Sequence, residues 1–303
     1  MTRSGAITTI GNPVLSAGFL VDEGMLGVSL KHRGHELVAL PNSVEAYQAG
    51  KLTGIPLMHP WANRLRSHIY RVANRTVQLP VSVPADGNGL PMHGVMHGRK
   101  FVVRAHSQHK LDAQFEFIDD TLLDVFPFPH RITVTAEIQP SGSANANALT
   151  ITTAITNLGE SAMPISFGWH PYLVASAAPR NTWRLRMPAC TRHVLDEQLL
   201  PTGMVTQIPV FDEAIGTTTF DDHYQLGADR RFAISTAETT IDIEFDDGFA
   251  HAQVYVPPDR GDDQRNFVCI EPMTAPSNAL GDGVAPMLDV AATFSAAFTI
   301  TVT

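Results

Sequence analysis

The sequence predicts an all-β protein built as a large antiparallel β-sandwich, and three observations carry this prediction. Apolar residues alternate with polar residues in several segments, turn-forming residues separate these segments, and no segment has the capped periodicity of a helix of about 12 residues or more. Alternation places one side of a strand in a core and the other side toward water. Many short strands between turns are typical of a sandwich or a barrel.

Four segments show the alternation most clearly, and these are residues 132–138, 149–155, 241–245 and 294–302. In each of them Ile, Val, Leu, Phe or Ala occupies nearly every second position. Stretches rich in Gly, Pro, Asp and Asn, of which residues 84–89 are an example, predict the turns between strands. We therefore expect antiparallel strands at these four places.

The length and charge of the chain limit its organisation and its partners. The 303 residues show no linker, no shift in composition and no long low-complexity tract, so we expect one domain over residues 1–303. The formal charge of −9 argues against a nucleic-acid-binding protein, because phosphate neutralisation needs a clustered basic face. The densest basic stretch, residues 64–75, is interspersed with apolar residues and predicts an exposed pair of strands.

Several features favour a cytoplasmic protein without a membrane partner. No apolar run approaches the ~18 residues of a membrane span, and the first residues lack the apolar block of a signal peptide. The two cysteines, Cys190 and Cys269, match no metal or redox motif and are too few for a disulfide framework. A reducing compartment is the simplest interpretation.

Thirteen histidines make metal binding the first chemistry to test. His93 and His97 have the i, i+4 spacing of a zinc-binding helix, but Gly94 and Gly98 follow them and Pro91 precedes them. That motif needs a helix and a Glu after the first His. We therefore expect no metal site and no cofactor, and we interpret the other closely spaced pairs, His32/His35 and His106/His109, as surface histidines.

A carboxylate and an imidazole stand out among apolar neighbours. Glu271 follows the apolar run 267–270, and His170 lies between Trp169 and Pro171. A buried carboxylate must be hydrogen-bonded, paired or functional, and a Glu and a His in one pocket would be a base and an acid near neutral pH. On the residues alone, Glu271 could also be a solvated or Arg-paired strand end, and His170 a satisfied core histidine.

Taken in order, five segments resemble the aldose 1-epimerase (galactose mutarotase) family, and these are residues 63–80, 90–94, 167–172, 220–224 and 270–279. The resemblance implies the galactose mutarotase-like supersandwich, with a sugar bound in an open cleft and no metal or organic cofactor. It implies Glu271 and His170 as catalytic residues. It also implies Arg64, His93 and Asp221 as substrate-binding residues, with Asp222 as the adjacent alternative to Asp221.

The resemblance leads us to expect a mutarotase that interconverts the anomers of a free aldose. Glu271 is the expected base and His170 the expected acid, while Trp61 or Trp169 would cover the apolar face of the sugar. The family often has an Arg four residues after the histidine at 93, and His97 stands there instead, which leaves the sugar open. A small sugar is the expected partner of a monomer or homodimer.

Three alternatives stay open at this point. The first is a 1-epimerase of a hexose 6-phosphate or a modified sugar, for which Arg66, Arg99 and Lys100 supply cationic groups. The second is a noncatalytic carbohydrate-binding protein. The third is a structural β-sandwich module that binds another protein and no sugar.

Overall fold

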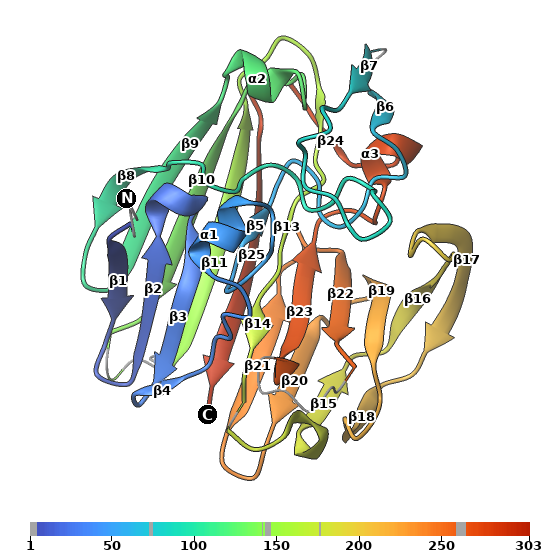
Figure 1. Cartoon of the computed structure of the whole chain (residues 1–303). Helices are drawn as coiled ribbons and strands as arrows, with labels where there is room; N and C mark the ends of the chain where they lie inside the picture. The colour runs from blue at the N-terminus through green and yellow to red at the C-terminus, as the bar shows by residue number, and fades with distance from the viewer. Residues whose placement is uncertain (1–4, 73–74, 141, 143–146, 176, 259–264) are drawn as a thin grey trace.

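Two large antiparallel sheets, of nine and eight strands, dominate the computed structural model (Figure 1). The structure describes residues 5–72, 75–140, 142, 147–175, 177–258 and 265–303. In spatial order, the nine-stranded sheet consists of β18 (Phe211–Ala214), β15 (Arg184–Met187), β20 (Arg231–Ser235), β21 (Thr240–Phe245), β25 (Thr293–Val302), β11 (Ala148–Asn157), β10 (His130–Ile138), β9 (Lys110–Phe117) and β8 (Val102–His106).

The second large sheet carries most of the site. In spatial order it consists of β17 (Pro201–Ile208), β16 (Cys190–Leu195), β19 (Phe220–Leu226), β22 (His251–Val256), β23 (Val268–Met273), β13 (Gly168–Trp169) and β5 (Leu57–Met58), and β14 (Tyr172–Leu173) also pairs with β23. The register between β22 and β23 sets Gln253 opposite Glu271, and the register between β19 and β22 sets Asp221 opposite Tyr255.

Smaller elements complete the described fold. A four-stranded sheet contains β1 (Ile7–Gly11), β2 (Leu15–Leu20), β3 (Leu26–His32) and β4 (His35–Glu36), and the two-stranded sheets are β6 (Ile69–Val72) with β7 (Arg75–Gln78) and β12 (Met163–Pro164) with β24 (Met287–Leu288). The helices are short: α1 (Val44–Gln48), α2 (Asp120–Leu123), α3 (Ala279–Asp282) and the 3-10 turns Val21–Glu23 and Arg180–Thr182.

The four segments predicted from alternation are β10, β11, β25 and β21, which are neighbours in the nine-stranded sheet. Ile132 pairs with Ile155, and Ile151 pairs with Phe298, so apolar residues face the same side of the sheet across strand boundaries. These side chains are at most 1% exposed. The period-two pattern therefore specified both the strands and their buried face, and the predicted antiparallel β-sandwich is confirmed.

The two large sheets pack face to face, with the four-stranded sheet extending the layer formed by β5, β13 and β23 (Figure 1). The bridges Gly27↔Ile55 and Val38↔Leu173 join the four-stranded sheet to this layer. On β22 and β23 the fully buried Val254 and Ile270 belong to the main core. Since side chains alternate along a strand, Gln253 and Glu271 point to the other face, where the candidate site lies.

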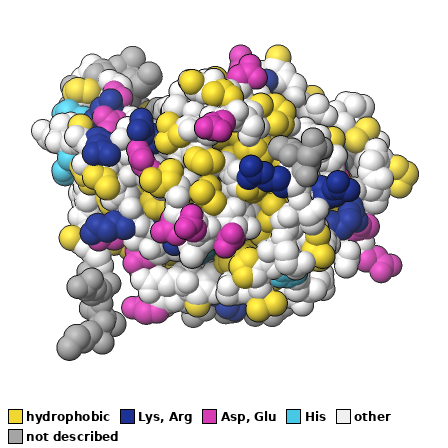
Figure 2. Space-filling view, turned by 90° about the horizontal axis from the view of Figure 1, so that it is seen from above, with side chains coloured by type: hydrophobic (Ala, Val, Ile, Leu, Met, Phe, Trp, Pro, Cys, Tyr) yellow, Lys and Arg dark blue, Asp and Glu magenta, His cyan; other side chains and the backbone are white. Residues whose placement is uncertain are grey.

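Charged side chains of both signs are interspersed on one face of the molecule. On the face shown in Figure 2, basic side chains lie beside acidic and apolar ones. The arginines of the basic stretch, residues 64–75, differ in exposure. Arg71 and Arg75 are exposed and lie on β6 and β7, which form the predicted pair of strands, whereas Arg64 is buried. Residues 73–74, which follow β6 in the sequence, lie outside the described residues. Within the described ranges, no helix is long and apolar enough to cross a membrane.

Candidate active site

All five predicted site residues line one cavity of about 270 Å³. This volume is close to the ~300 Å³ at which small-molecule sites begin. Four larger hollows among the described residues, of about 1370, 970, 350 and 340 Å³, are lined by none of the five residues. The lining residues of the small cavity are Gly50, Leu52, Asn63, Arg64, Met92, His93, His170, Tyr172, Asp221, Gln253, Tyr255 and Glu271.

Glu271 and His170 are in direct contact in this cavity. Nε2 of His170 lies 3.0 Å from Oε1 of Glu271, and the two residues are only 6% and 1% exposed. Gly168 of β13 pairs with Met273 of β23, which brings the end of one strand beside the other. The imidazole stacks on the ring of Tyr172 at 4.5 Å between centroids, and this contact limits its rotation.

The strand register decides which aspartate belongs to the site. Asp221 lines the cavity, where its Oδ1 accepts a hydrogen bond of 2.7 Å from Nε2 of Gln253. Asp222, the next residue on β19, faces the opposite side of the sheet and lies 3.8 Å from Nη1 of Arg192. Of the two alternatives that the sequence left open, the structure therefore places Asp221 in the cavity that holds His170 and Glu271.

Arg64 and His93 come from two irregular segments that pair with each other. Arg64 forms an isolated bridge with Met92, and the backbone N–H of His93 donates to the carbonyl of Asn63 at 2.9 Å. His93 has a left-handed backbone (φ 61°), and so does Gly94 (φ 70°). A Cβ at Gly94 would lie 2.1 Å from the carbonyl oxygen of His59, so this turn requires glycine.

An acidic partner orients the guanidinium of Arg64. Its Nε donates to Oδ2 of Asp86 at 2.8 Å, and its Nη1 donates to Oδ1 of Asn63 at 3.0 Å. Burial raises the pKa of Asp86, but hydrogen bonds from Arg64 and from the backbone N–H groups of Leu90 and Asn88 outweigh it, so the pKa is lowered. Asp86 therefore remains a carboxylate that can hold Arg64 in place.

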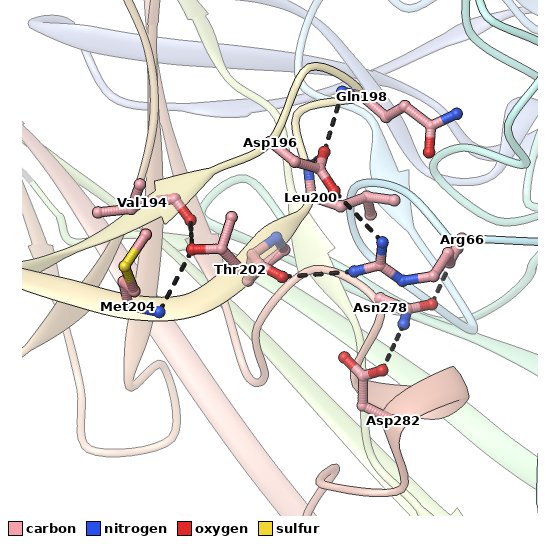
Figure 3. Close-up of polar contacts among 10 residues, drawn as sticks. Arg66, Val194, Asp196, Gln198, Leu200, Thr202, Met204, Asn278 and Asp282 are labelled. Carbon is pink, nitrogen blue, oxygen red and sulfur yellow. Dashed lines mark hydrogen bonds and ion pairs between the residues drawn. The ribbon is translucent and has the colours of Figure 1, made fainter.

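Asn278 fixes the backbone on both sides of Leu65. Its N–H donates to the carbonyl of Arg64 at 2.8 Å. Its Oδ1 accepts from the N–H of Arg66 at 2.9 Å (Figure 3). The Arg66 side chain then reaches the β16–β17 hairpin, where Nη1 lies 3.3 Å from Oδ2 of Asp196. Asn278 adopts a left-handed backbone (φ 63°), a strained conformation that is common near functional sites.

Burial controls the protonation of the central pair. It raises the pKa of Glu271 well above its ordinary value, an effect to which Asp221 adds and which Arg64 opposes. It lowers the pKa of His170 to about 3, and it lowers the pKa of His93 well below the ordinary value. Both directions follow from the cost of desolvating a charge. Burial therefore favours the form in which Glu271 holds the proton and both side chains are neutral.

Several buried polar atoms of the lining residues have no hydrogen-bond partner within the described structure: Glu271 Oε2, Gln253 Oε1, His93 Nδ1 and His170 Nδ1. Buried polar groups are normally paired, so a cluster of such atoms requires an explanation. All four belong to side chains around one cavity, and they include both donors and acceptors. The arrangement is suited to a small ligand with several hydroxyl groups.

One expectation about the surroundings of the site is wrong. Trp61 and Trp169 are fully buried and do not line the cavity; Nε1 of Trp169 donates to Thr153 in the core. A Trp side chain at these positions fills the sandwich, and the aromatic rings that line the cavity are Tyr172 and Tyr255. His97 packs on Tyr47 and lines a different cavity from His93, so these two histidines do not form a shared site.

The sequence analysis missed Gln253 and Asp86. Gln253 lies within the apolar run of β22 and is 2% exposed, so the argument applied to Glu271, a polar residue within an apolar strand, would also have found it. Asp86 lies in a turn-forming stretch, where an aspartate is ordinary. Its contact with Arg64 depends on the pairing of two irregular segments and has no local signal.

Comparisons with known proteins identify the family and the fold of the chain. The profile of the Aldose 1-epimerase family matches residues 25–284. YihR of Escherichia coli (strain K12) is 25% identical over 243 residues, which cover 76% of this chain and 74% of YihR.

The solved structure of an aldose epimerase homologue from C. elegans has a TM-score of 0.79 at 15% identity, and the match covers 99% of both chains. That of a galactose 1-epimerase from Lactobacillus acidophilus NCFM has a TM-score of 0.73 at 15% identity and covers 95% of this chain and 91% of its own. Because the family profile spans most of the sequence, the chain belongs to the aldose 1-epimerase family.

Proposed function

We propose that the protein is a mutarotase that interconverts the α and β anomers of a free aldose. The observation that carries the proposal is the 3.0 Å contact between His170 and Glu271 in a cavity of small-molecule size. General acid–base catalysis needs groups of both kinds within hydrogen-bond reach of one substrate. Membership of the aldose 1-epimerase family supports the same class of reaction.

The reaction consists of two coupled proton transfers. The Glu271 carboxylate takes the proton of the hydroxyl on C1, and the electrons of that O–H bond form the carbonyl. The bond between C1 and the ring oxygen breaks, and the ring oxygen receives a proton from His170. After rotation about the C1–C2 bond, the reverse steps close the ring on the other face of C1. The pair then holds the same single proton as before.

The pair must hold one proton, and that proton must reach His170 when the sugar reacts. Burial places it on Glu271, whereas the positive charge of Arg64 lowers the pKa of this carboxyl and favours the ionised form. The two groups share the proton across 3.0 Å, so its transfer requires no external donor. A sugar that hydrogen-bonds to both groups would replace their direct contact and use the proton in the same way.

The other lining residues would orient the sugar. Nη2 of Arg64 and a ring nitrogen of His93 would donate hydrogen bonds to hydroxyl or ring oxygens. Asp221 and the Oε1 atom of Gln253 would accept hydrogen bonds from hydroxyl groups, and Oε1 has no partner within the described structure. Tyr172 and Tyr255 would contact the apolar face of the ring.

The charges around the cavity support a free aldose over a sugar phosphate. Among the described residues that line the cavity, Arg64 is the one Lys or Arg, and Asp86 pairs with it. The other cations considered for a phosphate make contacts elsewhere: Arg66 with Asp196, Lys100 with Asp22, and Arg99 with the carbonyl of Val95. A noncatalytic sugar-binding protein would need no acid in contact with a base, so the pair also supports catalysis.

Polarimetry of freshly dissolved α-glucose and α-galactose tests the proposal directly. Galactose is included because one structural neighbour is a galactose 1-epimerase. We expect turnover of more than one free aldose, with larger differences in KM than in kcat, because the acid and base act at C1 and the ring oxygen, which all aldoses share. No acceleration of any sugar would contradict the proposal, and a strict requirement for a 6-phosphate would replace it by a sugar-phosphate epimerase.

A further inference from the structure

Three histidines converge on adjacent strands beside the sugar cavity: His193 on β16, His223 on β19 and His251 on β22. One ring nitrogen from each lies within 4.8 Å of the others. Nε2 of His223 lies 3.1 Å from Nδ1 of His251, and the ring of His193 is 4.8 Å from that of His223 between centroids. We call these three residues the histidine cluster.

The histidine cluster lies on the same face of the sheet as the catalytic pair. The strand register sets Glu271 opposite Gln253, and Gln253 opposite His223. Directly paired residues point to one face, so these three residues form a row across three strands. Gln253 separates the cluster from Glu271, and the cluster therefore lies outside the acid–base pair.

The side chains have the donor chemistry of a transition-metal site. His223 is fully buried and the other two are half-buried, so the site can be reached from the surface. Imidazole binds a metal ion through a neutral ring nitrogen, and the cluster offers one ring nitrogen from each of three adjacent strands.

The spacing of one pair of nitrogens is close to that of a tetrahedral site. Zinc–nitrogen bonds of ~2.0–2.1 Å imply nitrogens about 3.3 Å apart, and Nε2 of His223 lies 3.1 Å from Nδ1 of His251. The nitrogen of His193 lies within 4.8 Å of both. Within the described structure, Nε2 of His193 and Nδ1 of His223 have no hydrogen-bond partner, so part of this polar cluster is unsatisfied without a ligand.

We propose that the histidine cluster binds one divalent transition-metal ion of the zinc class, which cross-links β16, β19 and β22 beside the sugar cavity. Imidazole ligands without carboxylates favour zinc, copper or nickel over magnesium or calcium. Three histidines leave the fourth tetrahedral position open to water. The ion lies outside the proton circuit of Glu271 and His170 and takes no part in the anomer exchange.

Calorimetric titration of the chelator-treated full chain with Zn²⁺ tests the site, with Mg²⁺ as the control ion. We expect one Zn²⁺ per chain, no Mg²⁺ binding, and a higher thermal midpoint for the zinc-loaded protein. Co²⁺ should give the visible absorption of a tetrahedral nitrogen site. Because removing even an outer-shell partner of a metal ligand costs about 10–100-fold in affinity, His193→Gln and His251→Gln should each weaken Zn²⁺ binding by at least about 100-fold.

The matched control is His35→Gln, which removes an exposed histidine on β4 and should leave binding unchanged. The two cluster variants replace half-buried residues, and an unchanged circular-dichroism spectrum establishes that they fold. Equal Zn²⁺ affinity in wild type, His193→Gln and His251→Gln would overturn the proposal, as would binding below one equivalent. Mutarotation should continue at the same rate after chelation, whereas a loss of activity restored by Zn²⁺ would overturn the separation of this site from the reaction.

Discussion

Nε2 of His170 lies 3.0 Å from Oε1 of Glu271, and the two side chains are almost completely buried. The contact joins a residue that follows β13 to the middle of β23. Burial disfavours the charged form of both groups, whereas the proposed reaction uses them as a carboxylate and an imidazolium. The pair is therefore expected to determine the rate, the pH dependence and part of the stability of the protein.

Removing either member of the pair should abolish most of the activity. Losing one proton-transfer group typically costs ~10²–10⁴ in rate, so Glu271→Gln and His170→Asn should each lower kcat by at least about 100-fold. Both should still fold and bind sugar, which calorimetry can measure. Since both residues act in one proton circuit, the double variant should be little slower than either single variant. Near-normal mutarotation by folded Glu271→Gln would refute the assignment.

The pH profile should be a broad bell. The active form carries one proton on the pair, and its limits belong to the pair as a whole. Because burial lowers the pKa of His170 to about 3, activity should rise only near that pH as the second proton leaves. Because burial raises the pKa of Glu271, activity should persist well above pH 4.5 and fall only when this group ionises.

Initial rates corrected for spontaneous mutarotation measure the profile, and nitrogen NMR of His170 reports its protonation. The imidazole should be neutral at pH 6 in the free protein. A His170 that titrates near the ordinary ~6.5 would contradict the expected effect of burial.

Glu271→Gln should be more stable than wild type at neutral pH. The folded-state pKa of Glu271 is raised, so above pH 4.5 the folded chain holds a proton that the unfolded chain has lost. The stability of the wild type relative to this variant therefore falls as pH rises from 4.5 toward the folded-state pKa. Thermal unfolding should show a growing advantage of the variant over this window, by roughly 2–4 °C for each kcal/mol. An advantage that shrinks with rising pH would contradict the buried, protonated carboxyl.

Asn278 should act as a positioning residue for Arg64. Asn278→Gly keeps the left-handed backbone and loses two side-chain hydrogen bonds, the one accepted from the N–H of Arg66 and the one donated to Asp282, which should together cost about 1–3 kcal/mol of unfolding free energy. Asn278→Ala should lose roughly 1–2 kcal/mol more, because Ala disfavours that backbone conformation. In both variants KM should rise more than kcat falls. If Asn278→Gly and Asn278→Ala were equally stable, or if KM did not change, this role would be excluded.

Local pattern was sufficient for four strands of the nine-stranded sheet and for the residue types of the proposed catalytic pair. The alternation in β10, β11, β21 and β25 is a property of consecutive residues, and it predicted which side of each strand is buried. The two-residue strands β5, β13 and β14 carry no such period. They exist because β23 and its neighbours offer them backbone partners, so sequence patterning did not predict them.

The site residues, like the strands, could be predicted only in part from the sequence. Glu271 and His170 could be singled out because each is a titratable residue among apolar neighbours, and the ordered motifs added Arg64, His93 and Asp221. Asp221 could not be separated from Asp222 until the register between β19 and β22 assigned them to opposite faces. The burial of Trp61 and Trp169 in the core likewise depends on segments distant in sequence.

The sequence by itself therefore determined the all-β class, four strands of the nine-stranded sheet and the residue types available for acid–base chemistry, because these depend on neighbours along the chain. Only the tertiary structure decided which distant side chains meet. These contacts are the 3.0 Å contact of His170 with Glu271, the ion pair of Asp86 with Arg64, and the convergence of His193, His223 and His251. These contacts join segments distant in sequence, and the pKa shifts arise from the burial that the same segments impose. Long-range strand pairing and desolvation are properties of the folded chain, and for that reason no local pattern predicts them.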